Sequence, residues 1–266
     1  MAADRRSGGV SGTILIGAAF LFVLTLLLAT PARSEDPLRI FAAASTIAAI
    51  GDAVAQFKTR TGIRAAPVFA SSGALARQLA AGAPGHVFLS ADKKWMTWAQ
   101  QQGAIDPKSR RVFLRNRLVL AAQKRAGLKI PGITKAEFRK VLGAKRIAIA
   151  DPAHAPLGAH TRDALRWLGV WEEVASKALR MSDAARARAL VERGEAAFGI
   201  LYESDVKASS RLEPVAVFAA DAHKPIEYEI ALTRIGKADM RAAKFLDWLA
   251  GKDARGIFIK YGFRAD

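Results

Sequence analysis

The chain contains no cysteine, which excludes disulfide bonds and the cysteine-linked anchor of exported lipoproteins. Histidine is also rare, with four residues in 266. The pair nearest in sequence, His154 and His160, is six positions apart, which is not the spacing of one helical turn that a metal-binding pair needs. Neither a metal centre nor a catalytic serine with a histidine partner is indicated.

Three motifs that often reveal an activity are missing as well. The sequence has no G-x-S-x-G, no P-loop and no G-x-G-x-x-G, so nucleotide binding and nucleophilic serine chemistry lack support. A secreted hydrolase that uses Asp92, Asp151 and His154 remains an alternative. Asp92 and Asp151 follow strand-like segments, where an aspartate commonly caps the next segment or begins a turn.

The first 34 residues have the pattern of a secretory signal peptide. Arg5 and Arg6 precede an apolar run from about Ile14 to Leu28, and small residues follow as far as Ser34. We expect cleavage after Ser34, which leaves a mature chain of 232 residues in the periplasm of a Gram-negative cell. A retained membrane anchor is the alternative, although an apolar run of about 15 residues is shorter than the roughly 20 that span a membrane.

Positive charge is in excess, with 41 Lys and Arg against 24 Asp and Glu and a formal net charge of +17. Loss of the signal peptide removes three arginines and one aspartate and leaves +15. The basic residues are dispersed and do not form a tail or alternate with aromatic residues, so we expect no nucleic-acid partner. Such a surface attracts small anions from a distance without selecting among them.

From residue 38 onward, strand-like segments alternate with helical patterns, which is typical of an α/β protein with a mostly parallel sheet. Strands are predicted at Leu38–Ala42, Arg64–Phe69, Val87–Leu89, Leu118–Ala122, Arg146–Ala150, Ala197–Tyr202, Val215–Phe218 and Tyr228–Leu232. Helices are predicted at Thr46–Arg60, Gly73–Ala81, Lys93–Gln102, Lys135–Leu142, Ala159–Leu168, Ala184–Arg193 and Met240–Ala250.

Two segments suit crossings between a pair of lobes, namely Arg115–Arg117 before one strand and Glu227–Glu229 at the start of the last one. We therefore predict a signal peptide at 1–34, a first lobe formed by 35–116 and 229–266, and a second lobe formed by 117–228. In open α/β sheets the ligand lies beyond the carboxyl ends of the strands, so facing lobes would direct several strand-to-helix turns into one cleft.

Two segments of the first lobe have the same pattern. Leu38–Ser45 and Ala66–Gly73 are apolar strands that end in small residues and serine, and a helical pattern follows each. Helix starts carry unpaired N–H groups, and a serine hydroxyl adds a donor without charge, so Ser45 and Ser72 are candidates for an oxyanion site. The alternative is that both serines are ordinary helix N-caps.

Eight short motifs between residues 38 and 263 occur in the order typical of one protein family. They are Phe41–Ser45, Phe69–Ser72, Leu75–Gln78, Gly82–Pro84, Ser90–Asp92 with Trp95 and Met96, Asp151 and Pro152 with His154, Gly199–Tyr202 and Tyr261–Phe263. In these residues the chain resembles the periplasmic molybdate-binding proteins of ABC importers. The resemblance implies a type II periplasmic binding protein fold, which is α/β with two lobes and a ligand cleft between them.

The resemblance also implies a function. The protein would be a monomer without cofactor or enzymatic activity that captures molybdate or tungstate and delivers it to a membrane permease. Hydroxyl donors to the oxyanion are implied at Ser45, Ser72 and Tyr202, and backbone N–H donors at Leu157 and Ala184. These groups would contact the oxygens of molybdate and not the metal atom. Leu157 is larger than the residue familiar at that position and could narrow the cleft.

A site made only of donors selects against protonated anions, because an O–H group on the anion would find no partner. Size would then separate molybdate and tungstate from sulfate. A related protein for sulfate or phosphate remains an alternative, and an aspartate in the cleft would indicate phosphate.

The chain departs from the family pattern at Gly85 and His86, where the family commonly has Ala-Asp. The lobe interface or the permease contact could differ there. We expect His86 to be a solvated surface residue, with a pH-sensitive role as the alternative.

Overall fold

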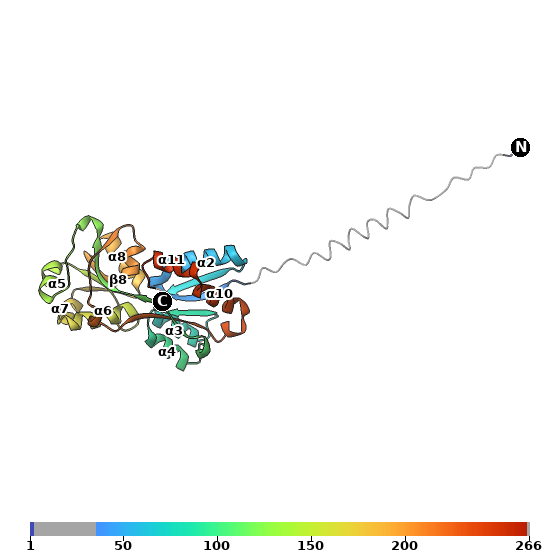
Figure 1. The fold of residues 1–266 in the computed structure, drawn as a ribbon, viewed down its shortest axis with the longest axis horizontal. Helices are drawn as coiled ribbons and strands as arrows, with labels where there is room; N and C mark the ends of the chain where they lie inside the picture. Colours follow the sequence, from blue (N-terminus) through green and yellow to red (C-terminus); the bar gives the residue numbers. More distant parts are fainter. Residues whose placement is uncertain (3–35, 265–266) are drawn as a thin grey trace. The chain divides into compact units, whose positions relative to one another are not determined.

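The computed structural model describes residues 1–2 and 36–264, and the chain divides into the units Met1–Asp36 and Pro37–Asp266. The predicted signal peptide, with the alternative of a membrane anchor, lies outside the described residues except at its first two positions. Within the described part of the chain, no helix is long and apolar enough to cross a membrane. The second unit carries the fold (Figure 1).

The first of its two sheets has the strand order β2-β1-β3-β10-β4. The strands are β1 Leu38–Ala43, β2 Ala65–Ala70, β3 Val87–Ser90, β4 Arg111–Asn116 and β10 Ile226–Leu232. The helices of this part are α2 Ile47–Thr61, α3 Ser72–Ala80, α4 Lys93–Gln101, α10 Met240–Ala250 and α11 Lys252–Lys260, with the 3-10 turns η1 Ala44–Thr46, η2 Pro107–Ser109 and η5 Gly236–Ala238.

Helices cover both faces of this sheet. Phe41 of β1 packs with residues of α3 and α4, whereas its neighbours Ile40 and Ala42 pack with Phe57 of α2. A strand that is buried on both faces needs apolar residues at successive positions, which explains the apolar run at the start of the fold.

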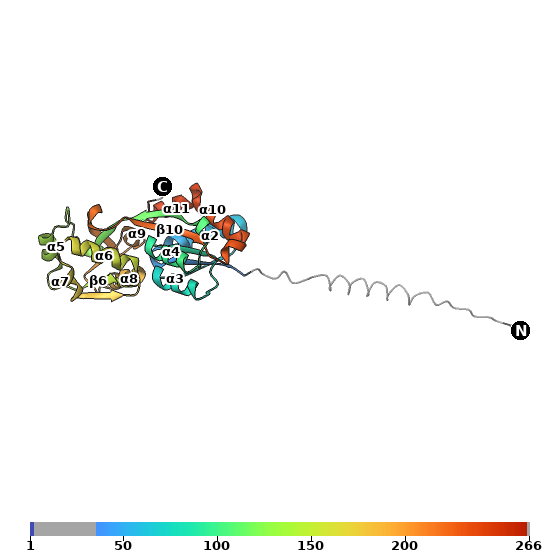
Figure 2. The same cartoon turned by 90° about the horizontal axis from the view of Figure 1, so that it is seen from below.

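The second sheet has the strand order β7-β6-β8-β5-β9. The strands are β5 Leu118–Gln123, β6 Ile147–Ala150, β7 Ala178–Met181, β8 Phe198–Tyr202 and β9 Leu212–Val217. The helices are α5 Lys135–Leu142, α6 Pro156–Trp167, α7 Trp171–Ala175, α8 Ala184–Arg193 and α9 Glu203–Lys207, with the 3-10 turns η3 Lys124–Ala126 and η4 Ala220–Ala222. Figure 2 shows α5, α6, α7 and α8 grouped with this sheet and α2, α3, α4 and α10 grouped with the first.

The expectation of a mostly parallel sheet holds for strand direction but is wrong for strand pairing. In each sheet four strands run in one direction, and β10 or β5 runs in the other. The reversed strand lies second from the edge, so four of the eight strand pairings are antiparallel. The connectivity explains this, because β5 and β10 each follow a crossing from the other sheet and enter from the opposite end.

The chain passes between the sheets twice, from β4 to β5 through Arg117 and from β9 to β10 through residues 218–225. The first crossing coincides with the predicted boundary at 116/117. The second predicted boundary, at 228/229, falls within β10. The division into lobes stays a prediction.

Candidate functional site

A small pocket lies where strand-to-helix turns of the two sheets meet, and it holds about 220 Å³ of empty space including its mouth. The five residues implied by the resemblance, Ser45, Ser72, Leu157, Ala184 and Tyr202, all line it. Much of the remaining wall consists of the small side chains of Ala43, Ala44, Ala70, Ser71, Ala91 and Ala155. The structure therefore brings together every residue that the sequence singled out for ligand binding.

Each of these residues lies at the carboxyl end of a strand or in the turn or helix start that follows one, which is why they converge. Ser45 lies in η1 after β1, Ser72 begins α3 after β2, and Tyr202 ends β8. Leu157 is the second residue of α6, and Ala184 is the first of α8. The two halves meet at this point, since η1 contacts both α8 and α9.

The two serines are not helix N-caps, so that alternative is wrong. The cap of α3 is Ser71, whose hydroxyl accepts a hydrogen bond from the Ala74 N–H at 3.3 Å. The Ser72 hydroxyl instead accepts from the Ala91 N–H at 2.9 Å. This bond uses a lone pair and leaves the Ser72 proton available to a ligand.

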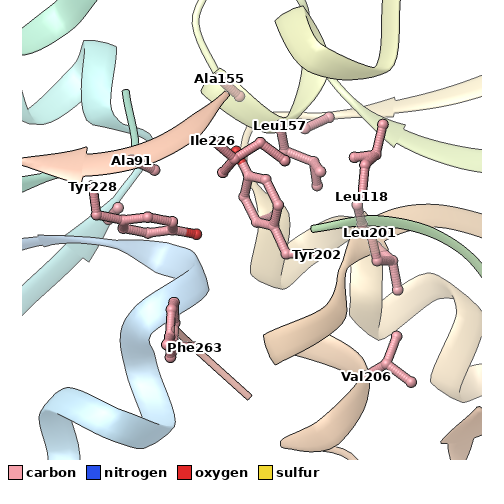
Figure 3. Packing of buried hydrophobic residues seen from close by; sticks show 14 of the residues in the cluster. Ala91, Leu118, Ala155, Leu157, Leu201, Tyr202, Val206, Ile226, Tyr228 and Phe263 are labelled. Atoms are coloured by element: carbon pink, nitrogen blue, oxygen red, sulfur yellow. The ribbon is translucent and has the colours of Figure 1, made fainter. Parts of the chain in front are cut away.

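Tyr202 is fully buried, and its hydroxyl has no hydrogen-bond partner among the residues that the structure describes. Burial raises the pKa of Tyr202 well above its ordinary value, so the group stays protonated and can donate. Its ring meets that of Tyr228 at a centroid distance of 5.9 Å and an angle of 62° (Figure 3). A buried hydroxyl without a hydrogen-bond partner lowers the stability of the protein unless a ligand supplies that partner.

Leu157 and Ala184 were predicted to act through the main chain. The N–H groups of the first helical turn have no partner within the helix, and both residues occupy that turn. The N-termini of α3, α6 and α8 thus point partial positive charge at one place. None of the described lining residues is a lysine or arginine, so any anion held here is held by neutral groups.

Comparison with known proteins assigns the chain to a family. The family model described as bacterial extracellular solute-binding protein matches residues 38–264. The chain belongs to this family. It is 39% identical to the molybdate-binding protein ModA of Escherichia coli (strain K12), over 94% of this chain and 96% of that protein. It is 36% identical to the protein of the same name from Haemophilus influenzae, over 74% of this chain and 77% of that protein.

A solved structure has the same fold as this solute-binding protein. It is that of the periplasmic molybdate-binding protein of Azotobacter vinelandii, with a TM-score of 0.76 and 23% identity, covering 86% of this chain and 99% of that one. The predicted fold class is confirmed: the chain is mixed α/β, with two five-stranded sheets, and matches the periplasmic binding proteins.

Asp183 also lines the pocket of the solute-binding protein, a position that was not predicted from the sequence. Its Oδ1 accepts from the Arg186 N–H at 2.9 Å, and its Oδ2 accepts from the Ser182 hydroxyl at 3.0 Å and the Arg186 guanidinium at 2.8 Å. These bonds make Asp183 the N-cap of α8. Three of the about four lone-pair sites of the carboxylate are therefore used, most of them in capping α8, and little accepting capacity is left for a protonated anion.

The residues considered for hydrolysis do not line this pocket. Asp92 caps α4 by accepting from the Trp95 N–H at 2.9 Å, and Asp151 accepts from the Ala153 N–H at 2.9 Å within a turn, as predicted. Burial raises the pKa of Asp92 to about 6. Among the described residues, no group of three histidine, aspartate or glutamate side chains is placed to hold a metal ion.

The expectation that His86 is a solvated surface residue is wrong. Its Nδ1 accepts from the Arg39 N–H at 3.0 Å, and its Nε2 lies 3.7 Å from the Asp239 carboxylate. Only 16% of the side chain is exposed, and burial lowers the pKa of His86. The imidazole therefore holds the start of β1 through the Arg39 N–H, and the aspartate common in the family would have to make this contact with a carboxylate oxygen.

Proposed function

We propose that this protein binds molybdate or tungstate in the pocket and delivers it to the permease of an ABC importer. The observation that carries the proposal is the composition of the pocket, where buried residues with neutral donors line the same space as the Tyr202 hydroxyl, which has no hydrogen-bond partner within residues 36–264. The names of the E. coli and H. influenzae relatives support the same ligand. In this proposal Ser45, Ser72 and Tyr202 donate hydroxyl protons, and Leu157 and Ala184 donate backbone N–H groups.

The donor set suits a divalent oxyanion. Hydrogen bonds from neutral groups to a charged oxygen are strengthened when water is excluded, and the N-termini of three helices add favourable potential. A protonated anion would meet donors at most positions, because three of the about four lone-pair sites of the nearby Asp183 carboxylate already accept hydrogen bonds. Size, set by the rigid wall, then distinguishes molybdate and tungstate from smaller oxyanions.

We further propose that the mature protein is exported to the periplasm after cleavage following Ser34 and works as a single copy. The two sheets would act as lobes that close on the ligand and open to release it. The permease would recognise the closed form. The protein would carry out no chemical step, since the proposed interactions are hydrogen bonds to an unchanged anion.

Sulfate is the second candidate ligand. Leu157 lines the pocket with a branched side chain that is 1% exposed, and such a residue reduces the space available to an anion. If Leu157 narrows the pocket enough, the smaller sulfate ion would fit the same donors better than molybdate.

A thermal-shift panel of oxyanions tests both candidates, because a ligand that binds only the folded state raises the melting temperature. Protein produced from the full chain is heated with molybdate, tungstate, sulfate or inorganic phosphate at equal ionic strength. We expect a rise with molybdate and tungstate and little change with the others. An equal or larger rise with sulfate would contradict selection by size and favour the second candidate.

A further inference from the structure

Ser45 is joined to two residues outside the pocket lining. Its hydroxyl lies 2.8 Å from that of Tyr228 on β10, and the Tyr228 hydroxyl lies 3.3 Å from the Asn116 amide nitrogen at the end of β4. All three side chains are buried. Hydrogen bonds that follow one another in a buried series polarise each other. The direction of each bond therefore affects the group at the end of the series, here the Ser45 hydroxyl.

The orientation of the Asn116 amide follows from its other partners. Its Oδ1 accepts the backbone N–H of Arg117 at 2.9 Å and that of Ser204 at 3.4 Å. Only oxygen can accept from two N–H donors, so the NH₂ group must face the hydroxyls of Ser204, at 2.7 Å, and Tyr228. Asn116 is therefore a donor to Tyr228.

Tyr228 then has one direction left for its own proton. Its oxygen accepts from Asn116, and Ser45 is its other hydrogen-bond partner within residues 36–264. Burial raises the pKa of Tyr228 far above its ordinary value, which keeps the hydroxyl protonated. Tyr228 consequently donates to Ser45, and the Ser45 proton is turned away from Tyr228.

We propose that Tyr228, oriented by Asn116, is a positioning residue that makes Ser45 a donor to the ligand and so sets the preference for fully deprotonated oxyanions. The proposal rests on the proposed function, because it assigns a direction to one of the hydroxyl groups that hold the anion. Without Tyr228, the Ser45 hydroxyl can rotate and offer a lone pair to a protonated oxygen. The residue thus acts through Ser45 and not by contact with the ligand.

The test uses Tyr228→Phe, with Tyr261→Phe as the matched control. The chain has three tyrosines, and the Tyr261 hydroxyl donates to Asp52 and does not line the pocket. Affinities for molybdate and for inorganic phosphate, which is largely monohydrogen phosphate just above neutral pH, are measured by calorimetric titration. We expect Tyr228→Phe to lower the ratio of molybdate affinity to phosphate affinity by about 10-fold and Tyr261→Phe to leave it unchanged. An unchanged ratio in Tyr228→Phe overturns the proposal.

A double-mutant cycle separates this role from a general loss of packing. If Tyr228 acts through Ser45, then Tyr228→Phe should have no further effect on molybdate affinity in the Ser45→Ala background. If the two substitutions reduce affinity independently, the effects multiply and the proposal is wrong. Failure of the unsubstituted protein to bind molybdate would instead contradict the proposed function.

If Tyr228→Phe does not unfold cooperatively, Asn116→Ala tests the same series of hydrogen bonds from its other end. The substitution removes the donor that fixes the Tyr228 proton but leaves both hydroxyls in place. We expect the same loss of discrimination against phosphate. Full discrimination in a folded Asn116→Ala protein contradicts the proposal.

Discussion

A Cβ atom on Gly73 would lie 2.6 Å from the main-chain carbonyl oxygen of His154, so the absence of a side chain at Gly73 permits this approach. Gly73 is the second residue of α3, and His154 lies in the turn before α6. The starts of two helices that belong to different sheets therefore touch beside the pocket. If the two sheets close on the ligand as proposed, this closure depends on the small size of Gly73.

Gly73→Ala should weaken molybdate binding by at least 10-fold, because the added methyl group also meets the Trp95 ring at 2.6 Å and has no free space. Titration followed by tryptophan fluorescence gives the affinity. Gly51→Ala in α2 is the control, since a Cβ there meets no atom within 4 Å. The control should keep its affinity and gain about 0.5–1 kcal/mol of stability from helix propensity. Normal binding by Gly73→Ala would show that closure is not required.

Ser45→Ala and Ser72→Ala should each weaken molybdate binding by about 1–3 kcal/mol, the usual loss for a hydrogen bond to a charged group. Ser72→Ala should in addition lower the free energy of unfolding by about 1–3 kcal/mol, because it leaves the Ala91 N–H without its partner. Calorimetric titration and urea denaturation measure the two effects. Ser176→Ala, on an exposed bond to the Glu173 carbonyl, is the control and should change neither quantity appreciably. Wild-type affinity in both pocket variants would rule out the assignment of these serines.

Salt should affect the two rate constants of binding differently. The net charge, +15 once the predicted signal peptide is removed, attracts anions over a long range and is screened by salt, so the association rate constant should fall as salt is added. The pocket lining contains no lysine or arginine among the described residues, so the dissociation rate constant should barely change. Stopped-flow fluorescence in sodium chloride of increasing concentration measures both. A steep rise in dissociation with salt would indicate a charged side chain on the ligand.

Asp205→Asn should change how stability depends on pH. Asp205 is fully buried, and burial raises its pKa from 3.8 to about 7. Between these values the folded protein keeps a proton that the unfolded chain releases, so this residue makes the free energy of unfolding decrease as pH rises. Between these two pH values, the free energy of unfolding of the variant should increase relative to that of the wild type by up to about 1.4 kcal/mol for each pH unit.

Urea denaturation of both proteins at a series of pH values provides the measurement. The difference between the two curves is needed because His160 acts in the opposite sense. Burial lowers its pKa from 6.5 to about 4, so its contribution makes stability increase with pH in that range. Parallel curves for wild type and Asp205→Asn would show that Asp205 does not titrate with a raised pKa.

Much of the fold was predictable because its central strands are buried on both faces. β1, β3, β6 and β8 lie inside their sheets, and their apolar runs mark them clearly. The edge strands β4 and β7 escaped prediction, since each carries arginine and is only partly buried. The helices α7 and α9 are five residues long, too short for a helical period to appear. The helix α11 was missed as well.

The pocket lining was predictable from residue types at the ends of strands, but its hydrogen bonds were not. The family resemblance selects Ser72 and not Ser71, but only the structure shows that Ser71 caps α3 while the Ser72 hydroxyl accepts from the Ala91 N–H. Nor does the sequence show that Tyr228 of β10 meets Ser45 of η1, because the two are 183 positions apart and the whole second sheet lies between them along the chain. Such contacts depend on the folded path of the chain.

The alanines of the pocket wall limit how this site can evolve. Ala43, Ala44, Ala70 and Ala91 each carry a single methyl group, so every replacement except glycine takes space from the pocket. Single mutations can therefore adapt the chain to a smaller anion by many routes. Space for a larger anion would come instead from Leu157, whose replacement by a smaller residue is a single mutation that enlarges the pocket. Changes in the alanine wall therefore shift the ligand range toward smaller ions, and a change at Leu157 shifts it toward larger ones.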